Sequence, residues 1–138
     1  MANDGGLSLS TLAQVAQPVT NLERSINFYR DTLVGTFIAK FDPPGLAFSD
    51  CGGVRLMLDA VVGAMEPPGS PLYVRVDDLD VAVAELRSRG IEFDGDPQMI
   101  NRDDAGDFGQ SGVETWMAFF RDPDRNLLAV MSESAPNA

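Results

Sequence analysis

The chain of 138 residues contains no histidine, which limits the side chains that could take part in catalysis or metal binding. That absence excludes a Ser-His-Asp or Cys-His pair, an imidazole base and any histidine-ligated metal. The one cysteine, Cys51, lies in the turn-like stretch SDCGG and has no histidine to activate it, so we interpret it as a small turn residue. A purely carboxylate site for a hard cation stays formally open.

A few other polar side chains could bind or react. Asp59, Tyr73 or Glu114 could transfer a proton in a metal-free isomerisation, hydrolysis or elimination, although no two of them form a convincing pair. Arg55 and Arg75 could hold an anionic group by paired hydrogen bonds.

The charge balance narrows the partners. Ten basic and 21 acidic residues give a formal charge of 10 − 21 = −11. A field of that sign repels nucleic acid and anionic membranes and favours a cationic ligand, or it serves solubility alone. No apolar run approaches the roughly 18 residues of a membrane span. We therefore expect neither nucleic acid nor membrane as a partner, and the single cysteine fits a cytoplasmic protein.

The sequence contains two copies of the set of elements that must position these groups. The stretches that begin at Gln14 and at Pro71 share one pattern at an offset of 71 − 14 = 57 residues. Each alternates for about six residues, reaches a polar helix cap (Asn21 or Asp78) and then takes helical spacing. Three strands should follow each helix. In the first half these are TFIAKF, LAFSD and VRLMLD, and in the second half they are IEFDG into PQMI, ETWMAFF and NLLAVMS.

This pattern predicts one α+β domain over residues 1–138. Module one covers about 10–60, a linker rich in proline and glycine covers about 61–70, and module two covers about 71–133. Residues 101–112 form a long acidic loop. Because neither half could cover its own sheet, we expect the halves to pack together.

The order of these elements resembles the vicinal-oxygen-chelate superfamily of glyoxalase I, extradiol dioxygenases, fosfomycin-resistance enzymes and bleomycin-resistance proteins. VTNLERSINFYRDTLV is similar to the family's strand-to-helix junction, and VRVDDLDVAVAELRSRGIEF to the second such junction. FFRDPDRNLLAVMSE is similar to the family's Asp-Pro-Asp-Gly-Asn turn, with Arg125 where glycine is usual. The resemblance runs from about Leu12 to Ser132 and implies two tandem β-α-β-β-β modules, which form a curved mixed sheet around a cup.

The turn itself has a structural purpose. Pro123 presets φ, and Asp122 and Asp124 can accept hydrogen bonds from nearby backbone amides. Arg125 in place of glycine indicates either a different turn type or an arginine held in the left-handed conformation, at a cost on the order of 1 kcal/mol.

The resemblance also implies where a metal would lie, on one residue from each of four cup-facing strands. Those positions are held here by Gln14, Met57, Pro71 and Ala129. Methionine is a soft ligand that does not suit hard divalent ions, and proline and alanine side chains donate nothing. We therefore expect no metal and no other cofactor, and we do not carry over the glyoxalase, dioxygenase or epimerase chemistry that depends on the ion.

Strand alternation then predicts the lining of the cup. The expected ligand-binding residues are Gln14, Met57, Tyr73, Arg75, Met117, Phe119 and Ala129. Most of this lining is apolar and soft, which is typical of a small-molecule pocket. Gln17 should instead face the helix layer, and Trp116 should face that layer or a partner.

Three functions remain open. The first is a metal-independent small-molecule-binding protein of the glyoxalase/bleomycin-resistance type, which would sequester a drug or metabolite in the cup. The second is an enzyme of the same superfamily that acts as an isomerase, lyase or hydrolase without the usual metal. The third is a structural or regulatory domain whose cup has closed. The resemblance further implies a homodimer.

Overall fold

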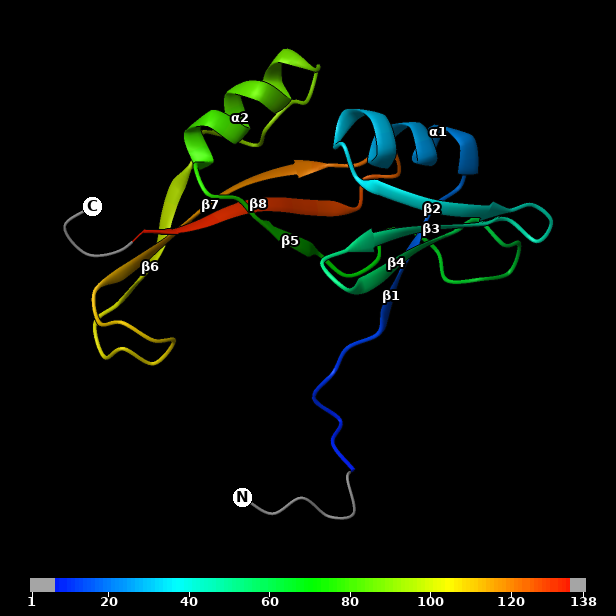
Figure 1. The fold of residues 1–138 in the computed structure, drawn as a ribbon. Coiled ribbons are helices and arrows are strands. Elements are labelled where there is room, and N and C mark those ends of the chain that lie inside the picture. Colours follow the sequence, from blue (N-terminus) through cyan, green and yellow to red (C-terminus); the bar gives the residue numbers. More distant parts are fainter. Residues whose placement is uncertain (1–6, 135–138) are drawn as a thin grey trace. The chain divides into compact units, whose positions relative to one another are not determined.

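The computed structural model describes residues 7–134 and contains two compact units, with the boundary between Pro67 and Pro68. Each unit carries one β-α-β-β-β module (Figure 1), so the predicted α+β class and the two-module organisation are confirmed. The ends of the expected domain, residues 1–6 and 135–138, lie outside the described residues.

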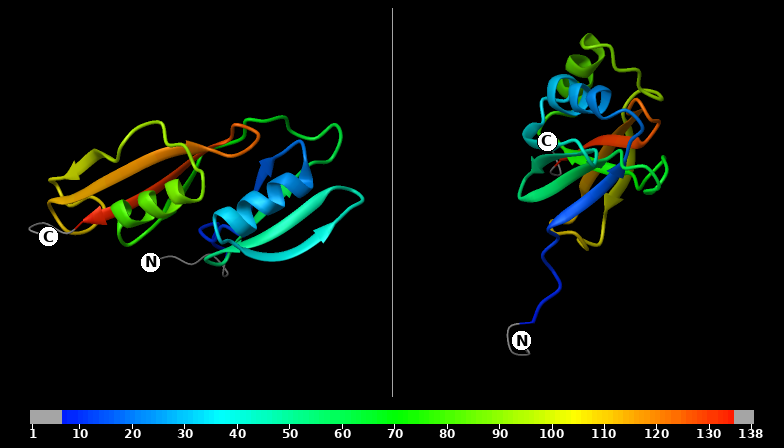
Figure 2. Two further views of the ribbon diagram at one scale, coloured as in Figure 1. Left: turned by 90° about the horizontal axis from the view of Figure 1, so that it is seen from above. Right: turned by 90° about the vertical axis from the view of Figure 1, so that its right-hand side faces the viewer.

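The first unit contains one four-stranded sheet with a helix against one face (Figure 2). Its elements are β1 (Gln14–Pro18), α1 (Leu22–Ile26), η1 (Asn27–Thr32), β2 (Thr36–Phe41), β3 (Leu46–Cys51) and β4 (Val54–Asp59). The strand order is β1-β4-β3-β2, in which β1 pairs with β4 in parallel and the other pairs are antiparallel. β2 and β4 have the bounds that the sequence predicts.

The second unit repeats this plan. Its elements are β5 (Leu72–Arg75), α2 (Leu79–Ser88), β6 (Gln98–Asp103), β7 (Val113–Arg121) and β8 (Leu127–Ser134). The strand order is β5-β8-β7-β6, and again the first strand of the module pairs in parallel with the last. The duplication in the sequence is therefore a duplication of topology.

Both helices begin at the predicted caps. The Asn21 side-chain oxygen accepts a hydrogen bond from the Arg24 amide at 3.0 Å, and the Asp78 carboxylate accepts one from the Val81 amide at 3.1 Å. These bonds satisfy amides that have no partner within the helix. The predicted apolar stripes are buried at Leu22, Ile26 and Tyr29 in the first unit and at Leu79 and Val83 in the second. The last residue of each predicted stripe, Leu33 or Leu86, is half-buried.

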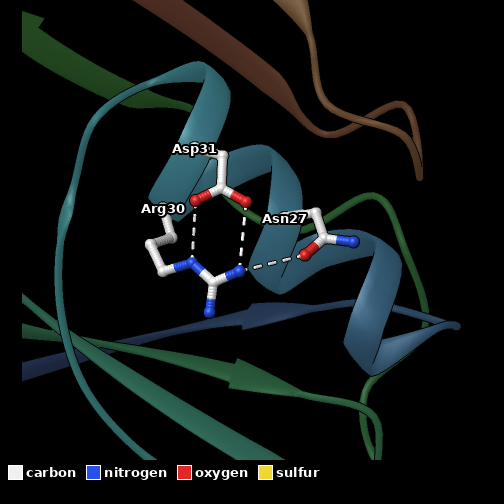
Figure 3. A network of polar contacts seen from close by, with 3 residues as sticks. All are labelled: Asn27, Arg30 and Asp31. Atoms are coloured by element: carbon white, nitrogen blue, oxygen red, sulfur yellow. Dashed lines mark hydrogen bonds and ion pairs between the residues drawn. The ribbon is translucent and has the colours of Figure 1, made fainter.

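The first helix changes its winding part of the way along, which its sequence does not signal. After Ile26 the chain continues as the π-helix η1, which ends with the Leu33 amide bonded to the Phe28 carbonyl at 3.0 Å. On its surface the Arg30 guanidinium binds both carboxylate oxygens of Asp31, at 2.8 and 3.0 Å, and the Asn27 amide oxygen at 3.2 Å (Figure 3). The hydrogen bond and charge of this pair lower the pKa of Asp31 and raise the pKa of Arg30.

The second unit corrects two predictions about strands. IEFDG was expected to begin a strand, but it contributes only an isolated bridge between Phe93 and Phe120. The acidic loop was expected at 101–112, but its first three residues complete β6 and pair with β7. The reason is a cross-strand ion pair between Arg102 and Glu114, which gives polar residues a place in the ladder.

One buried carboxylate organises the shorter loop, residues 104–112. Asp103 is 7% exposed, and its two oxygens accept the amides of Asp107 and Phe108, each at 2.8 Å. Its carbonyl accepts the Gly112 amide at 2.7 Å, which closes the loop. The loop is therefore a defined structure that holds Phe108, 85% exposed, at its surface.

The turn between β7 and β8 has the second of the two predicted geometries, because Arg125 has φ 68°. Asp122 accepts the amides of Asp124 and Asn126 at 2.8 Å, and its other oxygen accepts the Asn126 side-chain amide at 2.8 Å. The Asn126 oxygen in turn accepts the Gly69 amide at 2.7 Å. The turn thus fixes both its own strands and the segment that precedes β5.

Candidate functional site

On the first sheet, two of the predicted site residues lie together on the face opposite the helix. The Gln14 amide nitrogen donates to the Met57 sulfur at 3.7 Å, and the Gln14 oxygen accepts from Arg55 at 3.5 Å. Arg55 also lies 6.0 Å from the centre of the Phe48 ring. The result is a small cluster of one amide, one thioether, one guanidinium and one aromatic ring.

This cluster does not fit a divalent metal ion. The amide oxygen of Gln14, the one hard donor at the four expected ligand positions, faces the positive charge of Arg55. Met57 offers a soft sulfur, and Ala129 is 1% exposed and offers no donor. A divalent cation would be repelled by Arg55 and would find a single neutral oxygen ligand, Gln14. The residues present therefore do not support a metal-dependent step.

On the second sheet, the other five predicted residues lie in two rows on the face opposite α2, which is the open face of this sheet. Tyr73, Ala129 and Phe119 lie side by side across β5, β8 and β7, and the rings of Tyr73 and Phe119 meet edge to face at 6.5 Å. The next row holds Arg75, Met131 and Met117 in the same strand order. Ala129 is buried between two larger neighbours, which explains why a methyl group suffices there.

The charge of Arg75 already has a partner. Its guanidinium binds the Glu133 carboxylate at 2.8 Å, and Glu133 lies two residues beyond Met131 on the same face of β8. Sequence reasoning missed Glu133, although alternation along β8 from Ala129 and Met131 would have placed it here. An anionic ligand would have to compete with Glu133 for Arg75, whereas a cationic or dipolar one would find both signs of charge.

Two hollows lie beside these rows, both within the second unit. One, of about 270 Å³, is lined by Arg75, Glu133 and Thr115 together with Phe108 and Gln110 of the 104–112 loop. The other, of about 280 Å³, is lined by Met117, Phe119, Arg121 and the segment before β6. The loop residues Phe108 and Gln110 were not predicted as site residues, because a polar loop gives no alternation to read.

Two of the three groups proposed for proton transfer, Glu114 and Asp59, accept hydrogen bonds from other parts of the chain. Glu114 accepts hydrogen bonds from Arg102 and from the Trp116 indole at 3.1 Å, and these bonds, the one from Arg102 first, lower its pKa. Asp59 accepts the Val61 amide at 3.0 Å at the end of β4. Trp116 lies on the helix-covered face of the second sheet, as predicted.

The model of the Glyoxalase/Bleomycin resistance protein/Dioxygenase superfamily matches residues 11–130. The chain belongs to this superfamily. The match covers both modules, from the residues before β1 to Val130 of β8. Among curated proteins, none matches the sequence.

Several solved structures share the fold over almost the whole chain. TnmS3, an antibiotic binding protein from a Streptomyces species, is 25% identical with a TM-score of 0.73, over 93% of this chain and 99% of that one. A glyoxalase/bleomycin resistance protein/dioxygenase from Nocardioides is 23% identical with a TM-score of 0.67, over 95% and 88%. An integron cassette protein from the mobile metagenome of Vibrio cholerae is 21% identical with a TM-score of 0.69, over 91% and 97%.

Within residues 7–134, no helix has the length and apolar character needed to cross a membrane. The helices of this superfamily member are short and amphipathic, with one face on a sheet.

Proposed function

We propose that this superfamily member is a metal-independent small-molecule-binding protein that sequesters a drug or metabolite on the open faces of its sheets. The observation that carries the proposal is the make-up of those faces. Aromatic rings and thioethers from Tyr73, Phe119, Met117 and Met57 are exposed or half-buried there, while the four expected metal positions offer one hard donor, the Gln14 amide oxygen. Such surfaces suit flat or irregular organic molecules.

The similarity to an antibiotic binding protein supports the same function. TnmS3 is described by its binding activity, and it matches this chain over nearly its full length. A binding role requires only an accessible surface of suitable shape and no catalytic group, and the open faces provide such a surface. The proposal assigns ligand binding to Gln14 and Met57 on the first sheet and to the five predicted residues on the second sheet.

Catalysis without a metal remains the alternative, but no contact favours it. The lowered pKa of Glu114 keeps that carboxylate ionised at neutral pH, so it is a poor proton donor. Its oxygens are occupied by Arg102 and Trp116, so it is also a poor base.

Thermal-shift screening with a panel of aromatic antibiotics and metabolites tests the proposal. A bound compound should raise the melting temperature and be recovered chemically unchanged, and its affinity should survive a metal chelator. The variants Tyr73→Ala and Met117→Ala should weaken binding about ten-fold or more by removing contact area.

Met99→Ala is the matched control, because Met99 is exposed and pairs with Trp116 on the opposite face of the same sheet. Equal losses in Met99→Ala and Met117→Ala would contradict the assignment of the open face. Recovery of a converted product would replace binding by catalysis. A need for added metal would overturn the metal-independent part of the proposal.

A further inference from the structure

A further hollow in the second unit lies away from the open face, between α2 and the helix-covered side of β7 and β8. It has a volume of about 700 Å³. Its walls come from the first turns of α2, the segment before β6, and the side chains of Trp116, Ser132 and Ser134. A groove of this volume is large enough for a small organic molecule.

The charge of the groove is strongly one-sided. Four aspartates line it, at positions 77, 78, 80 and 96, against one cation, Arg87. The Arg87 guanidinium forms an ion pair with Asp96 at 3.1 Å and lies 5.6 Å from the centre of the Phe93 ring. Asp78 caps the helix, so Asp77 and Asp80 remain as carboxylates without a partner among the described residues. Their charge outweighs the half-positive end of the helix beside them.

An aromatic wall faces these carboxylates. The Trp116 indole donates to Glu114 at 3.1 Å, and Arg102 holds Glu114 in turn, so the orientation of the ring is fixed from behind. The face of an indole attracts cations more strongly than any other side-chain ring. A fixed ring opposite free carboxylates is therefore a combination that favours a positively charged ligand.

A hydroxyl that opens onto the groove completes the arrangement. The Ser132 residue is 7% exposed, lines the groove, and has no side-chain hydrogen-bond partner among residues 7–134. Its hydroxyl is therefore accessible from the groove and can bind a ligand or water there. Its oxygen can accept a hydrogen bond from an ammonium group.

We propose that this groove, formed by Asp77, Asp80, Trp116 and Ser132, is a second binding site that takes organic amines in their protonated form. The ammonium group binds between the two carboxylates and the Ser132 hydroxyl, and the carbon skeleton lies on the indole. The proposal does not depend on the function proposed above, because the residues of the two sites lie on opposite faces of the second sheet.

The single tryptophan of the chain makes the test direct, because fluorescence excited at the red edge of tryptophan absorption comes only from Trp116. The full chain is titrated with phenethylamine and, separately, with phenethyl alcohol, which has the same ring and no charge. We expect a saturable change in Trp116 emission with the amine, which weakens as salt is added, and little change with the alcohol.

The variants Asp77→Asn and Asp80→Asn should each weaken amine binding about three-fold, because both carboxylates are exposed. Ser132→Ala should weaken binding by a similar factor. Asp104→Asn is the control, since it removes the same charge from an exposed position in the 104–112 loop. It should leave the affinity within error of the original chain.

Three outcomes would overturn the proposal. One is an emission that stays constant up to about 10 mM amine, a concentration at which even weak sites fill. Another is an equal response to phenethyl alcohol. The third is an Asp77→Asn, Asp80→Asn double variant that binds as tightly as Asp104→Asn. Failure here, together with intact losses in Tyr73→Ala and Met117→Ala, would remove the second site and keep the first.

Discussion

At the scale of single residues, the chain holds one polar group that neither fold nor function uses. Gln17 is 0% exposed, and both atoms of its side-chain amide lack a partner among the described residues. It pairs in register with Leu58 on the helix-covered side of the first sheet, where an apolar residue would be expected. A buried amide without hydrogen bonds costs about 1–3 kcal/mol of stability.

We predict that Gln17→Leu raises the free energy of unfolding by about 1–2 kcal/mol, since it removes that penalty at similar volume. Urea denaturation of the variant and the original chain measures the difference. Gln14→Leu, which changes an exposed amide on the same strand, should have an effect near zero. A clear loss of stability in Gln17→Leu would show that the amide has a partner, such as a buried water.

Cys51 provides a test by pH. Partial burial and then the charge of Asp50 raise the pKa of this thiol above its ordinary value of 9.0. A raised pKa means less thiolate at neutral pH, and the thiolate is the form that reacts. Alkylation by iodoacetamide should therefore be slow at neutral pH and rise only at alkaline pH.

Asp50→Asn should lower that pKa and speed alkylation at neutral pH, while the amide oxygen can still accept the Gly53 amide as Asp50 does at 3.2 Å. The rate of thiol loss against pH measures both effects. Fast reaction of the original chain at neutral pH would contradict the raised pKa and reopen a reactive role for Cys51.

At the scale of elements, the turn of residues 122–126 is held by several side-chain hydrogen bonds, and it tests how far a local motif controls stability. Asn126 is fully buried, and its side chain bridges Asp122 and Gly69. Asn126→Ala would leave a buried carboxylate and a backbone amide without those partners. We expect a loss of about 2–4 kcal/mol in the free energy of unfolding, measured by urea denaturation.

The adjacent residue should behave in the opposite way. Arg125 has φ 68°, a conformation that glycine adopts without strain, and glycine is usual there in the superfamily. Arg125→Gly should therefore leave stability unchanged or raise it by up to about 1 kcal/mol. If both variants lost stability equally, the turn would depend on the arginine side chain rather than on its backbone geometry.

Most elements could be predicted from the sequence because their signals are local. Asn21 and Asp78 predict the helix starts. β4 alternates between the buried Leu56 and Leu58 and less buried residues, and the first four residues of β2 alternate between exposed and half-buried. β6 was misplaced because Arg102 belongs to a strand only through Glu114, a partner 12 residues away. The π-helix was missed because its wider bonds, such as Leu33 to Phe28, leave no mark on composition.

The candidate site was harder to predict than the fold. Alternation placed Tyr73, Phe119 and Ala129 on one face, since parity along a strand is a local property. It could not reveal that Arg75 is paired with Glu133, or that Phe108 lines a hollow beside them, because both depend on contacts between separate segments. Which ligand such a face selects depends on shape, and no motif in the chain encodes shape.

At the scale of the whole molecule, each of the two sheets has two edge strands, which pair on one side only within residues 7–134. The edge strands are β1 and β2 in the first sheet and β5 and β6 in the second, and several of their apolar side chains are exposed, namely Ile38, Phe41, Val74, Met99 and Ile100. Open strand edges with apolar side chains invite pairing with another chain. This agrees with the homodimer that the superfamily resemblance implies.

We therefore predict a homodimer in solution, to be measured by light scattering coupled to size exclusion. Ile38→Lys and Met99→Lys place a charge on the edge strand of each sheet in turn, and the variant at the interface should shift the mass toward that of a monomer. A monomeric mass for the original chain at high concentration would contradict the prediction. An unchanged dimer in both variants would place the interface on β1 or β5.

The hydrogen bond from the Gly69 amide to the Asn126 side-chain oxygen joins the segment before β5 to the turn between β7 and β8 within the second unit. The segment before β5 is therefore held by the turn between β7 and β8, the last two strands of the same module. Opening of that hairpin should release the leading segment in the same event, so the amides of Gly69 and of the β7–β8 ladder should share one opening free energy in hydrogen exchange. In the first module the corresponding contact is a backbone bond, from the Arg55 amide to the Ala13 carbonyl at 2.9 Å, which joins the start of β4 to the segment before β1.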